Sequence, residues 1–142
     1  MSSEALLAAY VATCYRVYLP GDCLDLRVGE ANAPLAAWLA REGITCFAVL
    51  TAFNPGSIVL SAEENAQRQA DLIGELLLGN YETYNAENLA DNAAWPLEES
   101  VFVPHLERLD ALALAADYGQ NAVLWGSAEG IPMLAWTAEL DT

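Results

Sequence analysis

The apolar run TCFAVLTA at residues 45–52 constrains the fold of this chain more than any other stretch. It is apolar on both faces and rich in residue types that favour strands, so it predicts a strand in the middle of a sheet. Asn-Pro-Gly at residues 54–56 then breaks the strand, and Ser61 with Glu64 forms a capping box that starts a helix. The sequence therefore predicts a buried strand, a polar turn and a helix in succession.

The other segments predict an α+β fold built on a single-layer, mainly antiparallel sheet. An N-terminal helix and a hairpin over residues 13–28 come first, followed by a helix that Asn32 and Pro34 open. From the central strand onward the order is strand, helix, two strands, helix and two strands. Strands in adjacent pairs favour antiparallel pairing, so we expect a ferredoxin-like arrangement, with helices on one face and the N-terminal helix and hairpin added.

Hydrophobic spacing predicts the buried side of the two helices that follow the central strand. Apolar residues three and four positions apart predict that the helix after Ser61 buries Ala66, Ala70, Ile73 and Leu77. The same spacing predicts that the helix over residues 107–118 buries Leu109, Leu112, Ala113 and Ala116. Residues 85–96 are rich in Asn, Ala and Asp and predict a long loop between these helices.

Length and composition indicate one domain over residues 1–142. Of these residues 55% are hydrophobic, which is enough for one core. No apolar run approaches the roughly 18 residues that a membrane-spanning helix needs. Three cysteines at no metal-binding spacing fit a reducing compartment, and Glu4 stands where a secretion signal carries cations. We expect a cytoplasmic protein without a metal site or a cofactor.

The charge balance predicts a strongly acidic surface. Five arginines and no lysine face 20 acidic residues, so the net charge is −15. Such a surface repels phosphates and anionic lipids, so we expect neither direct nucleic-acid binding nor membrane binding. The scattered carboxylates favour a role in solubility, and the alternative is a module that binds a basic protein or imitates nucleic acid. A homodimer through the hairpin is a further alternative.

Polar side chains gather where the central strand gives way to the helix, and others follow a later strand. We predict a ligand-binding site at these strand ends, made of Asn54, Ser57, Asn65, Arg68, Trp95, Gln120, Asn121 and Trp125. Each residue type also has an ordinary structural role. Arg68 can form an exposed ion pair with Glu64 and Asp71, amides can cap exposed backbone, and tryptophans can fill the core.

No complete catalytic motif occurs in the chain. The single histidine, His105, follows a proline and precedes a helix, where a turn role is commoner than a base. There is no strand-to-helix Gly-x-Ser-x-Gly elbow, and a Walker loop needs a lysine that the chain lacks. Glu99 is the candidate carboxylate base for a hydrolase or transferase that acts on water.

Three motifs resemble one protein family. They are residues 51–57 (TAFNPGS) followed by Leu60-Ser61, Glu64-Asn65 and Arg68-Gln69, then Trp95-Pro96 with residues 98–100 (EES), and finally residues 119–126 (GQNAVLWG). In this order they resemble the opening, middle and closing motifs of the bacterial family catalogued as domain of unknown function 3293. The similarity covers about residues 10–136 and implies a small cytoplasmic bacterial domain without an established activity. It adds weight to the matching residues Asn54, Ser57, Asn65, Arg68, Glu99, Gln120 and Asn121.

These observations lead us to expect a binding module for a small polar or anionic ligand at the strand ends. In this hypothesis Arg68 pairs with an anionic group, the amides orient the ligand, and Trp95 or Trp125 stacks on it. The alternatives are an enzyme that uses Glu99 and an acidic interaction protein.

Overall fold

The computed structural model describes residues 2–92 and 94–141. The strands are β1 (Thr13–Leu19), β2 (Asp22–Leu26), β3 (Cys46–Leu50), β4 (Tyr84–Ala90), β5 (Glu98–Pro104), β6 (Ala122–Ser127) and β7 (Met133–Trp136). The helices are α1 (Ser3–Val11), α2 (Ala33–Glu42), α3 (Ala62–Leu78) and α4 (Arg108–Asp117), with short 3-10 helices η1 (Pro55–Ser57) and η2 (Thr137–Asp141). The predicted α+β class is confirmed.

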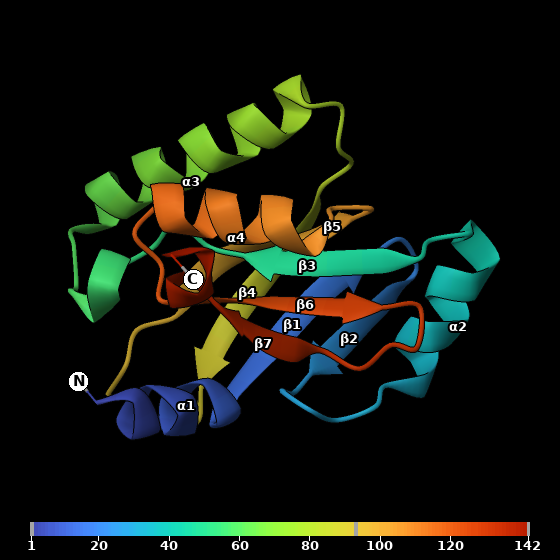
Figure 1. Cartoon of the computed structure of the whole chain (residues 1–142), viewed down its shortest axis with the longest axis horizontal. Helices are drawn as coiled ribbons and strands as arrows, with labels where there is room; N and C mark the ends of the chain where they lie inside the picture. Colours follow the sequence, from blue (N-terminus) through green and yellow to red (C-terminus); the bar gives the residue numbers. More distant parts are fainter. Residues whose placement is uncertain (1, 93, 142) are drawn as a thin grey trace.

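All the strands of the described residues belong to one sheet, in the order β2-β1-β4-β5-β3-β6-β7 (Figure 1). Every neighbouring pair is antiparallel, which confirms the predicted pairing. The hairpin of β1 and β2 extends the sheet beyond β4, and β7 extends it beyond β6. Antiparallel order places alternate strand starts and strand ends on the same edge, and this property assembles the candidate site described below.

β3 lies in the middle of the sheet, as its apolar sequence predicts. All five of its residues are buried, and β5 and β6 pair with its two sides. Successive side chains point to opposite faces, so Phe47 and Val49 belong to one hydrophobic cluster and Ala48 and Leu50 to another. The sheet therefore needs a covering layer on each face.

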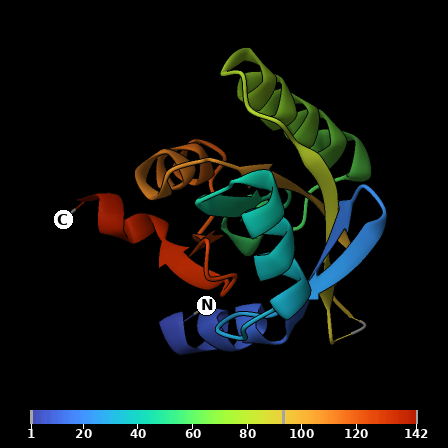
Figure 2. The same ribbon diagram turned by 90° about the vertical axis from the view of Figure 1, so that its right-hand side faces the viewer.

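Helix α2 covers the first face, and the sheet curls around it (Figure 2). Trp38 of α2 lies edge-on to Phe102, with ring centroids 5.9 Å apart. The amide of Asn32 donates to the carbonyl of Gly130 at 3.1 Å, which joins the loop before α2 to the loop between β6 and β7. The curl thus brings segments from the two ends of the sheet together beside α2.

Helices α3 and α4 both cover the opposite face (Figure 1). Leu72 of α3 and Leu112 of α4 pack there with Leu50 and Val103 of the central strands. The expectation that the helices share one face is therefore wrong for α2. The physical reason is that central strands with apolar side chains on both faces expose one of those faces unless a second layer covers it.

The buried side of α3 differs from the predicted stripe of Ala66, Ala70, Ile73 and Leu77. The residues that α3 buries are Asn65, Gln69, Leu72 and Leu76. Leu77, which was expected inside, is 56% exposed. The observed buried stripe is shifted by one residue from the predicted one. One residue corresponds to a rotation of about 100° around the helix axis, so two amide side chains face inward. These amides bind the end of β3, which a count of apolar residues does not anticipate.

The structure also differs from the predicted buried side of α4 and from the predicted long loop. α4 buries Ala111, Leu112 and Ala115, whereas Leu109 is 67% exposed. Half of the predicted loop, residues 85–90, is part of strand β4, which pairs with β1 on one side and β5 on the other. Asn, Ala and Glu are depleted in strands, but partners on both sides outweigh this weak preference.

Local signals set the helix ends as the sequence predicts. Asn32 caps α2 by accepting from the amide of Leu35 at 2.9 Å, and Gly43 ends it in the left-handed conformation. The capping box of Ser61 and Glu64 is present at the start of α3. Across residues 2–92 and 94–141, none of the helices combines the length and the apolar composition needed to cross a bilayer.

Candidate functional site

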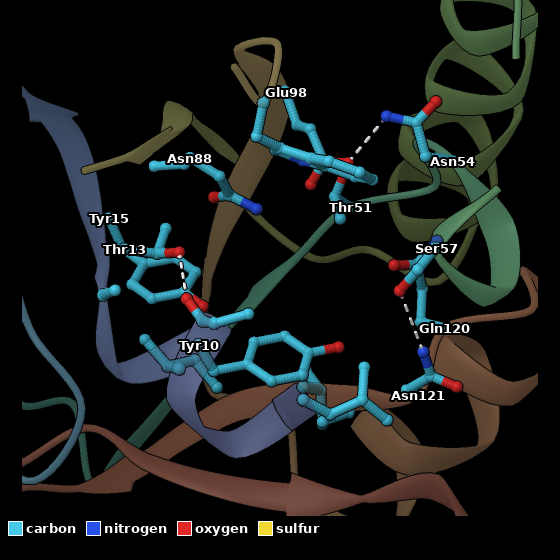
Figure 3. Close-up of a pocket in the computed structure, with 18 of the residues that line it drawn as sticks. Tyr10, Thr13, Tyr15, Thr51, Asn54, Ser57, Asn88, Glu98, Gln120 and Asn121 are labelled. Carbon is cyan, nitrogen blue, oxygen red and sulfur yellow. Dashed lines mark hydrogen bonds between the residues drawn. The ribbon is translucent and has the colours of Figure 1, made fainter. Parts of the chain in front are cut away.

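A cavity of about 450 Å³ lies at the edge of the sheet beside α1 (Figure 3). β1, β5 and β6 begin at this edge, and β3 and β4 end there. Tyr15, Val49 and Leu124 belong both to the core under α2 and to the cavity wall. The cavity therefore continues this core on the same face of the sheet, with α1 as a further wall.

The turn between β3 and α3 forms one rim of the cavity. Asn54 and Ser57 adopt positive φ angles of 47° and 65°, a conformation that non-glycine residues rarely adopt. Side chains of α3 hold this backbone from behind. Gln69 accepts from the amide of Ala52 at 2.8 Å, and Asn65 accepts from the amide of Asn54 at 2.9 Å. The buried amides of α3 thus replace the strand partners that β3 lacks beyond its last residue.

The side chain of Asn54 is oriented by its own hydrogen bonds. Its oxygen accepts from the side-chain nitrogen of Asn65 at 2.8 Å and from the amide of Leu60 at 3.0 Å. Its nitrogen must therefore face the other way, and it donates to Oε2 of Glu98 at 2.8 Å (Figure 3). The turn after β3 and the start of β5 are joined through this contact.

Glu98 is the carboxylate that lines the cavity. Burial raises its pKa, while hydrogen bonds from Asn54, Trp95 and Asn88 act in the opposite direction. Burial disfavours the charged form, and donors to a carboxylate favour it. Glu98 is therefore a hydrogen-bond acceptor whose charged form is disfavoured by burial and favoured by its donors.

Two further groups face the same space from α1 and β4. Burial and the nearby Glu98 raise the pKa of Tyr10 to about 12, so its hydroxyl stays protonated at neutral pH. The side-chain oxygen of Asn88 is buried and has no hydrogen-bond partner among the described residues. A buried acceptor without a partner is unusual in a folded protein.

Gln120 and Asn121 line the cavity and also tie the loop after α4 to the turn after β3. The side-chain nitrogen of Gln120 donates to the carbonyl of Phe53 at 2.9 Å, and that of Asn121 donates to Oγ of Ser57 at 3.4 Å. The amide of Gly56 adds a bond to the carbonyl of Gly119 at 2.8 Å. Gln120 therefore fills the backbone-capping role that was one of the two alternatives, whereas Asn121 bonds to a side-chain hydroxyl.

The structure brings five of the predicted site residues to the cavity wall, namely Asn54, Ser57, Trp95, Gln120 and Asn121. Asn65 lies behind Asn54 and supports it. Trp125 lies outside the lining, and its ring nitrogen donates to the carbonyl of Leu106 at 2.9 Å. Glu99, the candidate base, is exposed and also lies outside the lining. The two adjacent glutamates of β5 thus differ in environment, as strand alternation requires.

Arg68 donates to backbone carbonyls rather than to Glu64 or Asp71. Its Nε donates to the carbonyl of Ala52 at 2.8 Å, and its Nη2 donates to the carbonyl of Tyr118. Its guanidinium lies over the Tyr118 ring, 5.8 Å from the centroid. Arg68 therefore clamps the end of β3 to the end of α4, outside the cavity lining.

Sequence reasoning missed Tyr10, Asn88 and Glu98 as site residues. Glu98 belongs to the motif that contains Glu99, and only the pleat of β5 decides which of the two faces the cavity. Asn88 was placed in the predicted loop, and α1 was not expected near the strand ends. Among the described residues, no three His, Cys, Asp or Glu side chains are grouped as metal ligands.

One comparison with known proteins identifies a family. The family described as "Protein of unknown function (DUF3293)" matches residues 50–123. The match includes the turn after β3, α3, β4, β5 and α4 and ends in β6, so it contains Asn54, Asn88 and Glu98. No curated protein and no solved structure matches the chain. Because the match covers more than half of the sequence, the chain belongs to the DUF3293 family, whose function is unknown.

Proposed function

We propose that this chain is a binding module that holds a small polar molecule in the cavity beside α1. The observation that carries the proposal is the Asn54–Glu98 pair, whose amide is oriented by Asn65 and Leu60 before any ligand arrives. Cavities of roughly 300–1,000 Å³ with a few positioned polar groups in apolar walls are typical of small-molecule sites, and this cavity of about 450 Å³ falls in that range. Pre-oriented groups lose little freedom on binding, which favours affinity.

The lining favours a neutral or cationic ligand over the anionic one expected from the sequence. Glu98 is the carboxylate of the lining, and none of the described lining residues is an arginine or a histidine. The donors of Arg68 are directed at backbone carbonyls elsewhere. An anion in the cavity would lie near the partly buried carboxylate of Glu98 without a compensating cation, which is costly.

A thermal-shift screen of small metabolites tests the binding function, with a variant that fills the cavity. A ligand present at about 100 times its dissociation constant adds roughly 2.7 kcal/mol to the free energy of unfolding. Ala9→Trp places a large ring on α1 at the cavity wall, and we expect it to abolish the shift. Ala5→Trp is the matched control, because Ala5 lies on α1 and is exposed but lies outside the lining. A shift that survives Ala9→Trp contradicts binding in this cavity.

The second candidate function is an enzyme, a hydrolase or transferase in which Glu98 acts as a general acid or base. The specific observation in its favour is the partly buried carboxyl group of Glu98, which has a raised pKa and lies in a cavity that Tyr10 also lines. Glu99, which the sequence suggested for this role, is exposed. This function requires that Glu98→Gln abolish turnover of the bound molecule while the binding shift persists. Unchanged turnover in that variant excludes Glu98 as the catalytic group.

We also propose that residues 46–127 form a ferredoxin-like unit. The support is the chain order β3, α3, β4, β5, α4, β6, the sheet order β4-β5-β3-β6, and the location of α3 and α4 on one face. In this description α1, the hairpin, α2 and β7 are additions, and the cavity lies where the added α1 meets the unit. A crystal structure with a different strand order would contradict it.

A further inference from the structure

We propose that the cavity recognises its ligand through a cationic nitrogen group, an ammonium or an amidinium, which donates hydrogen bonds to the carboxylate of Glu98. This inference rests on the proposed binding function and adds the chemical class of the ligand.

The strand register places Asn88 and Glu98 next to each other. Asn88 of β4 is the direct partner of Glu98 of β5, and Tyr15 of β1 is the direct partner of Asn88. Direct partners in an antiparallel sheet carry their side chains on the same face, with Cβ atoms about 4.5–5.5 Å apart. Tyr15, Asn88 and Glu98 therefore form a row across three strands, and all three line the cavity (Figure 3).

The hydrogen bonds within the protein leave an acceptor position on Glu98 for a ligand. Asn88 bonds to Glu98 through its side chain, and only its nitrogen can donate to a carboxylate. Its oxygen is the buried acceptor without a partner in the described residues. The nitrogen of Asn54 is also engaged by Glu98. A carboxylate has about four acceptor positions, and Asn54, Trp95 and Asn88 use three of them, so a ligand that donates can complete the set.

The electrostatics of the cavity select for positive charge. Glu98 is partly buried, and a charge in such a place is stabilised chiefly by a partner of opposite sign. The described lining residues supply no cation, so the partner has to come from the ligand. The net charge of −15 adds a long-range field that attracts cations toward the molecule.

Aromatic side chains complete the environment of such a group. Tyr10, Tyr15 and Trp95 all line the cavity. Aromatic rings attract cations through their faces and also tolerate the apolar body of an organic amine. The site therefore suits an organic cation rather than a hydrated metal ion.

Three probes of one shape and different charge test the inference. Benzamidinium is cationic, benzamide is neutral and benzoate is anionic, and each consists of one ring with a planar head group. Binding at millimolar concentration is measured by chemical-shift changes in the ¹H–¹⁵N spectrum of the full chain at neutral pH. We expect benzamidinium to bind about tenfold or more tightly than benzamide, with shifts at the strand-end residues, and benzoate not to bind.

Two adjacent residues provide the matched variants. Glu98→Gln and Glu99→Gln remove the same charge from neighbouring positions of β5, but only Glu98 lines the cavity. We expect Glu98→Gln to abolish the preference for benzamidinium over benzamide and Glu99→Gln to preserve it. Retention of the full preference in a folded Glu98→Gln variant overturns the inference.

The remaining outcomes separate this inference from the proposed function. Equal affinity for the three probes, lost in Ala9→Trp, overturns the cationic recognition and leaves the binding cavity standing. Benzamidinium binding that survives Ala9→Trp shows attraction to the acidic surface and overturns the inference. Failure of benzamidinium to bind overturns it as well, while the thermal-shift screen still decides the proposed function independently.

Discussion

The side-chain nitrogen of Asn54 donates to Oε2 of Glu98 at 2.8 Å and thereby joins the turn after β3 to the first residue of β5. The two residues are 44 positions apart in the chain. The orientation of this bond depends on Asn65, which accepts from the amide of Asn54 and donates to its side-chain oxygen. Buried polar groups in such a network are costly to leave without partners, and this gives direct tests of the site.

Asn65→Leu removes two partners of Asn54 at once. We expect the free energy of unfolding to fall by about 2–3 kcal/mol, because a buried amide and a buried carbonyl oxygen lose hydrogen bonds. Urea unfolding measures the change. Gln67→Leu on the same helix is the control, since Gln67 is exposed and bonds only to Asp71 among the described contacts. A control change within about 0.5 kcal/mol is expected, and similar losses in both variants would contradict the role of the network.

Arg68→Met tests whether Arg68 is a structural clamp or a ligand contact. We expect a loss of about 1.5–3 kcal/mol in the free energy of unfolding, because the carbonyls of Ala52 and Tyr118 lose a charged donor. Ligand affinity for the cavity should not change in the folded variant. Arg41→Met, at an exposed position in the last turn of α2, should cost only a few tenths of a kcal/mol. Loss of binding by folded Arg68→Met would restore the role first expected for Arg68.

The raised pKa of Glu98 predicts how stability depends on pH. In the unfolded chain the carboxyl group titrates near its ordinary value of 4.5, and in the folded protein it titrates higher. The folded state therefore binds more protons between these two values, so the contribution of Glu98 to stability falls as pH rises through this window. Above the folded pKa the full penalty for burying the charge remains.

Urea unfolding of the wild type and Glu98→Gln between pH 4 and 8 isolates this contribution. The other carboxyl groups cancel in the difference between the two proteins. We expect the wild type to lose stability relative to Glu98→Gln as the pH rises, with no further change above the folded pKa. A difference that is constant with pH, or one that moves in the opposite direction, contradicts the raised pKa.

Gly119→Ala tests how closely the loop after α4 approaches the turn after β3. Gly119 has a φ of 70°, and an added Cβ would lie 2.8 Å from Cβ of Pro55. The matched control is Gly43→Ala, where φ is 67° and an added Cβ meets no atom within 4 Å. We expect the control to lose about 1 kcal/mol from backbone strain and Gly119→Ala to lose about 2–3 kcal/mol because of the added clash. Equal losses in urea unfolding would show that the two loops are not in tight contact.

Several elements could be predicted because their signals are local. The run at residues 45–52 is apolar on both faces and became the central strand. Asn32 and Gly43 bound α2, and Ser61 with Glu64 starts α3, as their side-chain and backbone chemistry requires. The family that the motifs resemble is the one that matches, although the match covers residues 50–123 rather than the expected residues 10–136.

Local sequence signals did not predict which faces of α3 and α4 are buried, nor that residues 84–90 form strand β4. A hydrophobic stripe assumes that the buried side of a helix is its most apolar side, but α3 buries Asn65 and Gln69 because the end of β3 needs their hydrogen bonds. β4 has a sequence that disfavours strands, and its pairing with β1 and β5 depends on segments distant in the chain.

The sequence by itself determined the α+β class, the central strand, the polar turn after it and the set of amides that surround that turn. Only the tertiary structure decided which of these groups face the cavity. The choice between Glu98 and Glu99 depends on the pleat of β5, and the choice between ligand and backbone as the partner of Arg68 depends on where α4 ends. The physical reason is that residue type sets what a side chain can bind, whereas the packing of distant segments sets which partner lies within reach.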